Sequence, residues 1–283
     1  MRYITNDGER SLMTTKKAAM IGDVVGELGL QTLEAKLPAL IKDFQIDFVT
    51  VNGENSAEGF GMTEKDFLRI AKAGADAVTS GNHVWEKREF WAILDNENIY
   101  PGKRMLRPAN YPNCSGGEIA GSGFACIEKN GVKWLVINLQ GRELMTAIDC
   151  PFQCFDKIIN TQASAAAPSV ILIDFHAESS REKEALAYYA DGRASLIAGT
   201  HTHIQTADER ILPKGSAYIT DLGMTGAACS VIGMDPKICL ERVRKQVLFQ
   251  MKTADGKAAK MQGVIAEIDT ETGTAVSIQR ISI

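Results

Sequence analysis

Short apolar runs alternate along the chain with longer stretches in which apolar residues recur at a helical period. The alternation is clear up to residue 94 and returns after residue 150. The apolar runs predict strands at residues 18–21, 46–51, 75–79, 170–174 and 195–198. The periodic stretches predict helices at residues 30–44, 64–73, 87–94, 152–159 and 181–189. Strands that alternate with helices favour a parallel sheet with helices on its faces.

Antiparallel strands are expected in the middle and at the end of the chain. Residues 116–127 and 132–139 have the pattern of paired strands around the turn Lys129-Asn130-Gly131. The tail from residue 246 onward has the pattern of three strands, two of which flank a turn at 270–273.

No repeat, low-complexity block or linker divides the chain. We therefore expect one α/β domain over residues 18–283, with two sheets packed face to face and helices outside. Residues 1–17 are polar and are expected to form a disordered N-terminal extension. Thr63 precedes the helix at 64–73 and is its expected N-cap.

Composition and charge narrow the class of protein. The 283 residues are 45% hydrophobic and 23% charged, with a net charge of −4, which is ordinary for a globular domain. Such a balance gives no strong electrostatic grip on nucleic-acid phosphates. No apolar run reaches the roughly 18 residues that span a bilayer, and the N-terminus lacks the apolar core of a secretion signal. Six cysteines without a C-x-x-C pair indicate reduced thiols, so we expect a cytoplasmic protein with no membrane partner.

Polar residues collect just past the C-terminal ends of the predicted strands. They are Asp23, Glu54, Asn82, His83, His176, His201 and His203. Ligands bind at this edge of open α/β sheets because the loops converge there. Taken alone, Gly22-Asp23 indicates no more than a turn, and a His-x-His pair arises by chance. The chain has only four histidines, however, and all four belong to this set.

The chemistry of this set fits metal binding. Imidazole nitrogen, carboxylate oxygen and amide oxygen together suit Mn, Fe, Zn or Co. The segment His201-Thr202-His203 is expected to be extended, which points both imidazoles to one side and toward two adjacent ions. The carboxylate of Glu54 can bridge such a pair. The sequence therefore predicts a two-metal centre.

The motifs, in this order, resemble the calcineurin-like metallophosphoesterases, and among them the YmdB-like branch. The resemblance extends from Lys17 to the C-terminus. It is carried by Gly22-Asp-Val-Val-Gly26, Val51-Asn-Gly-Glu-Asn55, Gly81-Asn-His83, Leu106-Arg-Pro-Ala-Asn-Tyr111, Asp174-Phe-His-Ala-Glu178, the stretch from Gly199 to Glu209 and Ile219-Thr-Asp-Leu-Gly-Met-Thr-Gly226.

Two positions depart from the broad superfamily. Val25 stands where an Asp-x-His motif has its histidine, and Glu54 stands where a bridging aspartate is usual. The YmdB-like branch shares both departures, and an asparagine matched by Asn55 takes over the missing ligand role. The arginine that commonly follows Gly26 in the branch is replaced here by Leu30, which affects expected phosphate contacts.

The resemblance implies a four-layer αββα sandwich, a dinuclear site and one free catalytic histidine. One metal ion would be held by Asp23, Glu54, Asn55 and His203. The second would be held by Glu54, Asn82, His176 and His201. His83 is left to act on the substrate. Two divalent ions are expected as cofactors, Fe or Mn in the first place and Zn as an alternative.

The implied activity is hydrolysis of phosphodiesters, with 2′,3′-cyclic nucleotides as the expected substrates and RNA ends as a further candidate. A hydroxide that bridges the two ions would attack phosphorus, and His83 would protonate the leaving oxygen or stabilise its charge. Substrate-binding residues are not assigned. We also expect a homo-oligomer.

Three alternatives remain open at this point. The glycines after the first predicted strand loosely mimic a dinucleotide-binding fingerprint, but Gly22, Gly26 and Gly29 have the wrong spacing and leave the histidines unexplained. A regulatory RNA- or protein-binding module with structural metals is the second alternative. It has no need of the free His83 or of an open coordination position. The third is a nucleotidase that acts on phosphomonoesters.

Overall fold

The computed structural model describes residues 14–91, 94, 104–112 and 119–283. Three of the predicted segments lie partly outside the described residues. They are the extension at 1–17, the helix at 87–94 and the strand at 116–127.

Within the described residues, the first sheet has six strands in the order β15-β14-β1-β3-β4-β5. Their bounds are β1 (Thr15–Ile21), β3 (Phe48–Asn52), β4 (Ala77–Thr79), β5 (Arg104–Met105), β14 (Gln262–Asp269) and β15 (Ala275–Ser282). β1, β3, β4 and β5 are parallel, as the alternation of strands and helices predicts. β14 and β15 complete the other edge in antiparallel pairing.

The second sheet also has six strands in the described part of the chain, in the order β10-β11-β9-β8-β7-β6. Their bounds are β6 (Phe124–Lys129), β7 (Val132–Gln140), β8 (Val170–His176), β9 (Leu196–Thr200), β10 (Arg210–Ile211) and β11 (Ala217–Ile219). β7, β8, β9 and β11 are parallel. β6 and β7 form the predicted hairpin, in which Asn130 and Gly131 take the positive φ angles of a tight turn.

The two sheets pack face to face through apolar side chains. Phe48 of β3 and Trp134 of β7 stack between the sheets with ring centroids 4.7 Å apart, and both side chains are buried. Such a pair contributes about 0.5–1.5 kcal/mol beyond the burial of its area. Met20 of β1 and Leu172 of β8 belong to the same core. This packing brings the carboxyl ends of strands from both sheets to one region.

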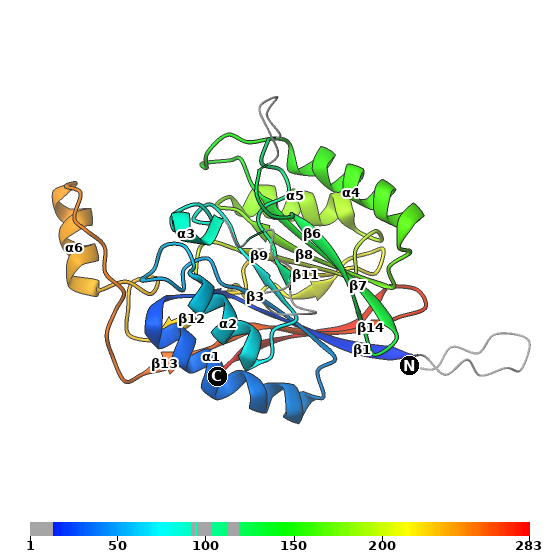
Figure 1. The fold of residues 1–283 in the computed structure, drawn as a ribbon, viewed down its shortest axis with the longest axis horizontal. Coiled ribbons are helices and arrows are strands. Elements are labelled where there is room, and N and C mark those ends of the chain that lie inside the picture. The colour runs from blue at the N-terminus through cyan, green and yellow to red at the C-terminus, as the bar shows by residue number, and fades with distance from the viewer. Residues whose placement is uncertain (1–13, 92–93, 95–103, 113–118) are drawn as a thin grey trace, which may run out of the picture.

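Helices cover the outer faces of both sheets (Figure 1). α1 (Gly26–Phe44) and α2 (Glu64–Ala73) pack on the first sheet, and α4 (Pro151–Ala165) and α5 (Ser180–Ala190) pack on the second. The Thr63 hydroxyl accepts the backbone N–H of Asp66, and the carboxylate of Asp66 accepts the N–H of Thr63. The predicted N-cap of α2 is therefore confirmed as a capping box. α3 (Arg88–Trp91) is a single turn.

A third, small sheet lies beside the ends of the larger ones. It consists of β2 (Asp23–Val24), β12 (Met224–Ala227) and β13 (Ala259–Lys260), with β12 in the centre. It pairs Asp23 with Met224, so the chain after β11 lies against the first turn of α1. A Cβ on Gly29 would approach the carbonyl oxygen of Thr225 to 2.5 Å, so only glycine allows this contact.

The structure corrects two expected element bounds and adds one helix that was not expected. Thr15–Lys17 belong to β1 rather than to a disordered extension, because they pair with β14. α1 begins at Gly26, four residues before the predicted start at Leu30. α6 (Pro236–Lys245) was not expected. Leu240 and Val243 of this helix are 55% and 69% exposed, so no apolar face toward a core marks it in the sequence.

α6 and its flanking loops project from the body of the molecule (Figure 1). The helix begins at a local signal, because the carboxylate of Asp235 accepts the N–H groups of Lys237 and Ile238. In the part of the chain that the structure describes, no helix is long and apolar enough to cross a membrane.

Candidate metal centre

Strand ends from both sheets place the predicted site residues at one edge. His176 is the last residue of β8, and His201 directly follows β9. Glu54 lies two residues past β3, and Asn82 lies three residues past β4. Asp23 opens β2, which directly follows the turn after β1. Parallel strands therefore deliver ligand-type side chains from distant parts of the sequence to one place.

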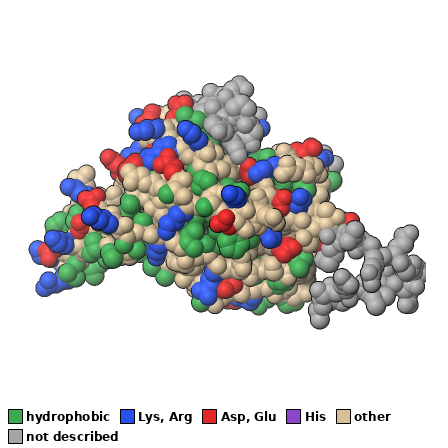
Figure 2. Space-filling view, turned by 90° about the horizontal axis from the view of Figure 1, so that it is seen from below, with side chains coloured by type: hydrophobic (Ala, Val, Ile, Leu, Met, Phe, Trp, Pro, Cys, Tyr) green, Lys and Arg blue, Asp and Glu red, His purple; other side chains and the backbone are tan. Residues whose placement is uncertain are grey.

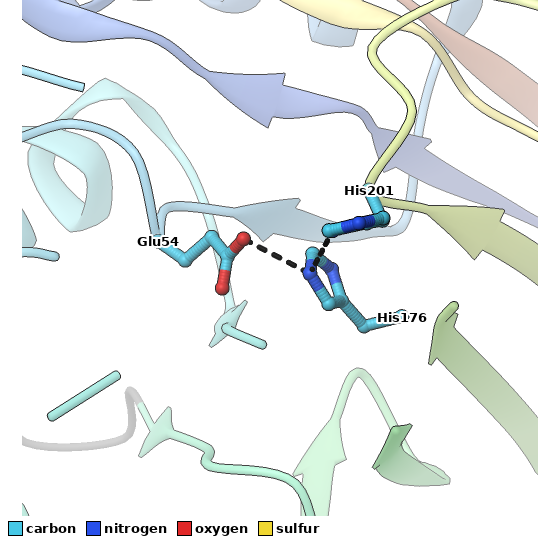
Figure 3. A group of neighbouring side chains, drawn as sticks. All are labelled: Glu54, His176 and His201. Carbon is cyan, nitrogen blue, oxygen red and sulfur yellow. Dashed lines mark hydrogen bonds and ion pairs between the residues drawn. The ribbon is translucent and has the colours of Figure 1, made fainter. Parts of the chain in front are cut away.

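His176 is the centre of a first group of side chains. Its Nε2 atom lies 3.0 Å from Oε1 of Glu54, 3.0 Å from Oδ1 of Asn82 and 3.0 Å from Nδ1 of His201. Figure 3 shows the two imidazoles and the carboxylate turned toward one another. Neighbouring ligand atoms of an octahedral ion with bonds of about 2.1 Å lie about 3.0 Å apart. The donor atoms and their spacing therefore fit a divalent metal ion.

Asp23, Asn55 and His203 form a second group. Nε2 of His203 lies 2.9 Å from Nδ2 of Asn55 and 3.6 Å from Oδ1 of Asp23. All three residues are buried, and Oδ1 of Asp23 and Oδ1 of Asn55 have no hydrogen-bond partner among the described residues. Unpartnered buried oxygens are costly, and a cation would satisfy both. Oδ2 of Asp23 accepts the backbone N–H of His201 at 3.3 Å, which links the two groups.

In each of the three histidines, the second ring nitrogen contacts an acceptor outside the two groups. Nε2 of His201 lies 3.2 Å from the Glu178 carboxylate, and Nδ1 of His203 donates to the carbonyl of Ile232 at 2.8 Å. Nδ1 of His176 lies 3.0 Å from the hydroxyl of Thr200. An acceptor on the outer nitrogen fixes the tautomer and points the lone pair of the other nitrogen inward, as in metal-binding histidines.

Thr200 connects His176 to the buried carboxylate of Asp174. Its hydroxyl donates to Oδ1 of Asp174 at 2.7 Å, so its oxygen is left to accept from His176. Oδ2 of Asp174 accepts Nδ2 of Asn52 at 3.0 Å and the hydroxyl of Thr79. These partners come from both sheets. Burial raises the pKa of Asp174, and the hydrogen bonds from Thr200 and Thr79 oppose that rise.

The electrostatics of the first group favour a positive charge at its centre. Burial alone would lower the pKa of His176, but Glu54, together with Asp23 and Asp174, outweighs burial and raises that pKa to about 9. Burial alone would raise the pKa of Glu54, but His176, together with His83, outweighs burial and lowers that pKa to about 2. Burial, together with His176, lowers the pKa of His201 to about 3. A cation that replaces the proton of His176 would meet one carboxylate and two neutral imidazoles.

In the second group, burial changes the pKa of the Asp23 carboxyl. Burial raises the pKa of Asp23 to about 6, and the nearby histidines oppose the rise. A nearby positive charge would stabilise this buried carboxylate as an anion.

His83 lies beside these groups, and its ring contacts residues outside them. Its backbone N–H donates to Oε2 of Glu54 at 3.2 Å. Nδ1 of its ring lies 3.5 Å from Oε1 of Glu86, and the ring packs edge-on against Phe60 with centroids 5.1 Å apart. In the described residues, the ring makes no hydrogen bond or ion pair with another predicted site residue.

The turn that carries His201 and His203 differs from the prediction. These residues were expected on an extended segment, but His201 has a φ of 101° and His203 a φ of 64°. The imidazoles therefore separate, with His201 beside His176 and His203 beside Asn55. The extended interpretation is wrong because hydrogen bonds from a distant part of the chain bend the segment.

The sequence model of the YmdB-like protein family matches residues 19–281 of this chain. The chain belongs to the YmdB-like family. The match covers every predicted site residue, and the resemblance read from the motifs is confirmed.

Relatives of known name agree with this assignment. The chain is 43% identical over 263 residues to the 2′,3′-cyclic-nucleotide 2′-phosphodiesterase of Bacillus subtilis, covering 93% of this chain and 95% of that protein. The crystal structure of a novel phosphatase from Mycoplasma pneumoniae superimposes with a TM-score of 0.87 at 32% identity, covering 96% and 94% of the two chains. A hypothetical protein from Thermus thermophilus gives a TM-score of 0.82 at 36% identity, covering 94% and 98%.

The structure adds residues to this YmdB-like site that we did not predict. Glu178, Thr200 and Asp174 orient histidines, although none was among the predicted ligands. Asp174 had a signal in the sequence, because it is a charged residue inside an apolar strand and lies on the same face as His176. Thr200 had none, because a threonine at the end of a strand is common.

Proposed function

We propose that this chain is a metal-dependent phosphodiesterase whose centre holds two divalent ions. The single observation that carries the proposal is the arrangement of three histidines, each of which has its outer nitrogen on an acceptor and its inner nitrogen beside another candidate ligand. The packing of helices and sheets supports the four-layer αββα sandwich as its fold. Fe or Mn would suit the mixed nitrogen and oxygen donors, with Zn as an alternative.

The two groups of side chains divide the ligands between the ions. One ion would be held by Asp23, Asn55 and His203, and the other by Asn82, His176 and His201. Glu54 would contribute to both. When bound, the pair supplies an activated water near neutral pH and charge neutralisation for the phosphate oxygens.

The residues around the centre hold it ready for an anionic substrate. The N–H of His83 fixes Oε2 of Glu54, while Oε1 faces His176, so the carboxylate cannot rotate freely. The side chain of His83 is 24% exposed, and the backbone N–H of the same residue holds that carboxylate. We infer that its imidazole donates a proton to a leaving oxygen.

The relatives support phosphodiesters as the substrate class. The Bacillus subtilis protein is named for 2′,3′-cyclic nucleotides, and its similarity extends over 93% of this chain. We infer that cyclic nucleotides are also the substrates here, with RNA ends as a further candidate. The net charge of −4 favours small substrates over long duplexes.

The test is hydrolysis by protein reconstituted with Mn²⁺ after chelation. We expect turnover of bis(p-nitrophenyl) phosphate and of 2′,3′-cyclic AMP, and little turnover of p-nitrophenyl phosphate. Glu54→Gln should abolish turnover, whereas Glu241→Gln on the projecting helix α6 should not change it. Turnover of the monoester alone would favour a nucleotidase. Bound metal without any turnover would favour a regulatory module.

A further inference from the structure

The turn between the two ligand histidines has a strained backbone that needs support. Both His201 and His203 have positive φ angles, a region that side chains other than glycine rarely adopt. Thr202 lies between them. Residues in such conformations persist only where their surroundings hold them. Glu178 and the carbonyl of Ile232 hold the two imidazoles, and Thr202 provides a further point at which the turn itself is held.

Asp221 supplies that support from a part of the chain nineteen residues away. Its Oδ2 atom accepts the hydroxyl of Thr202 at 2.8 Å and the backbone N–H of Thr202 at 3.2 Å. Its Oδ1 atom accepts the backbone N–H of Gly223 at 2.9 Å, which anchors the carboxylate itself. The carboxylate is 1% exposed, so water does not compete for these hydrogen bonds.

Lys183 compensates the buried charge of Asp221 from α5, which covers the sheet. Its ammonium group lies 2.7 Å from Oδ2 of Asp221, and its side chain is 1% exposed. The aliphatic stem of Lys183 passes over Gly199 in β9. A Cβ on Gly199 would lie 1.9 Å from the carbonyl oxygen of Thr220 and 2.8 Å from Cδ of Lys183, so a larger residue would clash with both. The glycine therefore makes room for a lysine that reaches a buried carboxylate.

We propose that the Lys183–Asp221 pair is a positioning device for the metal centre, which holds Thr202 so that His201 and His203 are oriented before metal binds. The inference rests on the proposed metal centre and adds residues 183, 202 and 221 to it. A buried ion pair is weak support for stability in general, because desolvation offsets the attraction of the charges. Its value here is the fixed geometry of one turn.

The test uses Thr202→Val, which removes one hydroxyl and keeps the shape of the side chain and the backbone N–H. Chelated protein is titrated with Co²⁺, and binding is followed by visible absorption. We expect Thr202→Val to weaken Co²⁺ binding by about 10- to 100-fold, the usual effect of removing an outer partner of a ligand. Thr202→Ser should restore wild-type binding. The matched control is Thr32→Val in α1, whose hydroxyl donates to the carbonyl of Leu28 and which should bind Co²⁺ as the wild type does.

Thermal unfolding of the chelated variants separates positioning from general stability. The inference requires Thr202→Val to keep the melting temperature of the chelated wild type while it loses affinity. Unchanged Co²⁺ affinity, or an equal loss in the serine and valine variants, would overturn it. Lys183→Met provides a second measurement and should weaken Co²⁺ binding at least as strongly. A wild-type protein that binds no Co²⁺ would contradict the metal centre itself, a result distinct from a failure of the positioning role alone.

Discussion

Nδ1 of His201 faces Nε2 of His176 across 3.0 Å. Only one hydrogen can lie between two such nitrogens, and the opposite nitrogens of both rings are already committed to Glu178 and Thr200. At least one of the two nitrogens therefore faces the other with a lone pair. Replacement of the intervening proton by a divalent ion would satisfy both rings at once.

The first prediction concerns the number of ions. Two groups of ligands predict two ions per chain after reconstitution with Mn²⁺. His203→Ala and His176→Ala should each retain about one ion, because each removes a ligand from a different group. Glu54→Gln should weaken both ions, since we propose that its carboxylate serves both. Metal analysis by mass spectrometry measures the content.

The control for the number of ions is a carboxylate that lies outside both ligand groups. Glu86→Gln alters a carboxylate that lies 3.5 Å from the His83 ring and outside both ligand groups, so it should keep both ions. One ion in the wild type, or full metal content in Glu54→Gln, would contradict the two-ion centre.

The second prediction concerns the pH dependence of chelated protein. The pKa of His176 is raised to about 9 from its usual 6.5, so the folded state binds this proton more tightly than the unfolded state does. Its stabilisation is complete below pH 6.5 and is lost as pH rises through 9. The pKa of Asp23 is raised to about 6 and that of His201 is lowered to about 3, so their contributions change mainly below about pH 7 and little between pH 7.5 and 9.

Urea unfolding of chelated protein at pH 6.5, 7.5 and 9 tests this prediction. We expect the free energy of unfolding to fall across the series in the wild type and to change less in His176→Gln. Metal-loaded protein should not show the decline, because metal and proton compete for the same nitrogen. An equal slope in His176→Gln would assign the pH dependence to other groups.

The sequence was informative where one strand end decides the position of a residue. His176, Glu54 and Asn82 could be placed at one edge because parallel strands share a direction, and the structure brings them within contact. The turn at His201 could not be predicted in the same way. Asp221 holds Thr202 of this turn by hydrogen bonds and forms an ion pair with Lys183 from a helix behind the sheet, and neither contact is visible in the sequence.

Helix α6 shows a different limit of sequence reasoning. Asp235 and Pro236 form a local start signal that could have been read. Apolar periodicity finds helices that bury one face, however, and Leu240 and Val243 remain exposed. A search for apolar periodicity therefore misses helices whose apolar residues stay outside the core.

The third prediction concerns this projecting arm, which we define as residues 231–249. It exposes large apolar side chains, including Leu248 at 84%, together with basic residues. Figure 2 shows hydrophobic and basic side chains together at the end of the molecule where α6 lies. Exposed apolar clusters of this kind often mark contacts between proteins. The expected homo-oligomer would use this arm.

Light scattering coupled to size-exclusion chromatography measures the mass in solution. The double substitution Leu240→Glu and Val243→Glu should reduce the mass of an oligomer to that of one chain. Val276→Glu on the exposed face of β15 is the control, since its side chain is 45% exposed outside the arm. A monomeric wild type, or an oligomer that survives the double substitution, would show that the arm does not mediate assembly.

The final prediction separates binding from chemistry at His83. The backbone N–H of His83 holds Glu54, and any residue other than proline retains that N–H. His83→Ala should therefore keep both ions and the melting temperature of the wild type. Loss of the imidazole should lower turnover of 2′,3′-cyclic AMP by about 10²- to 10⁴-fold, the usual scale of general acid catalysis. The loss should be smaller for bis(p-nitrophenyl) phosphate, because p-nitrophenolate leaves without needing a proton.

His176→Ala provides the contrast for His83→Ala, because it removes a ligand rather than a proton donor. It should lose metal and activity together on both substrates. The decisive comparison is metal content beside turnover for the two variants. If His83→Ala loses an ion, or loses activity equally on both substrates, then the imidazole of His83 is not the proton donor.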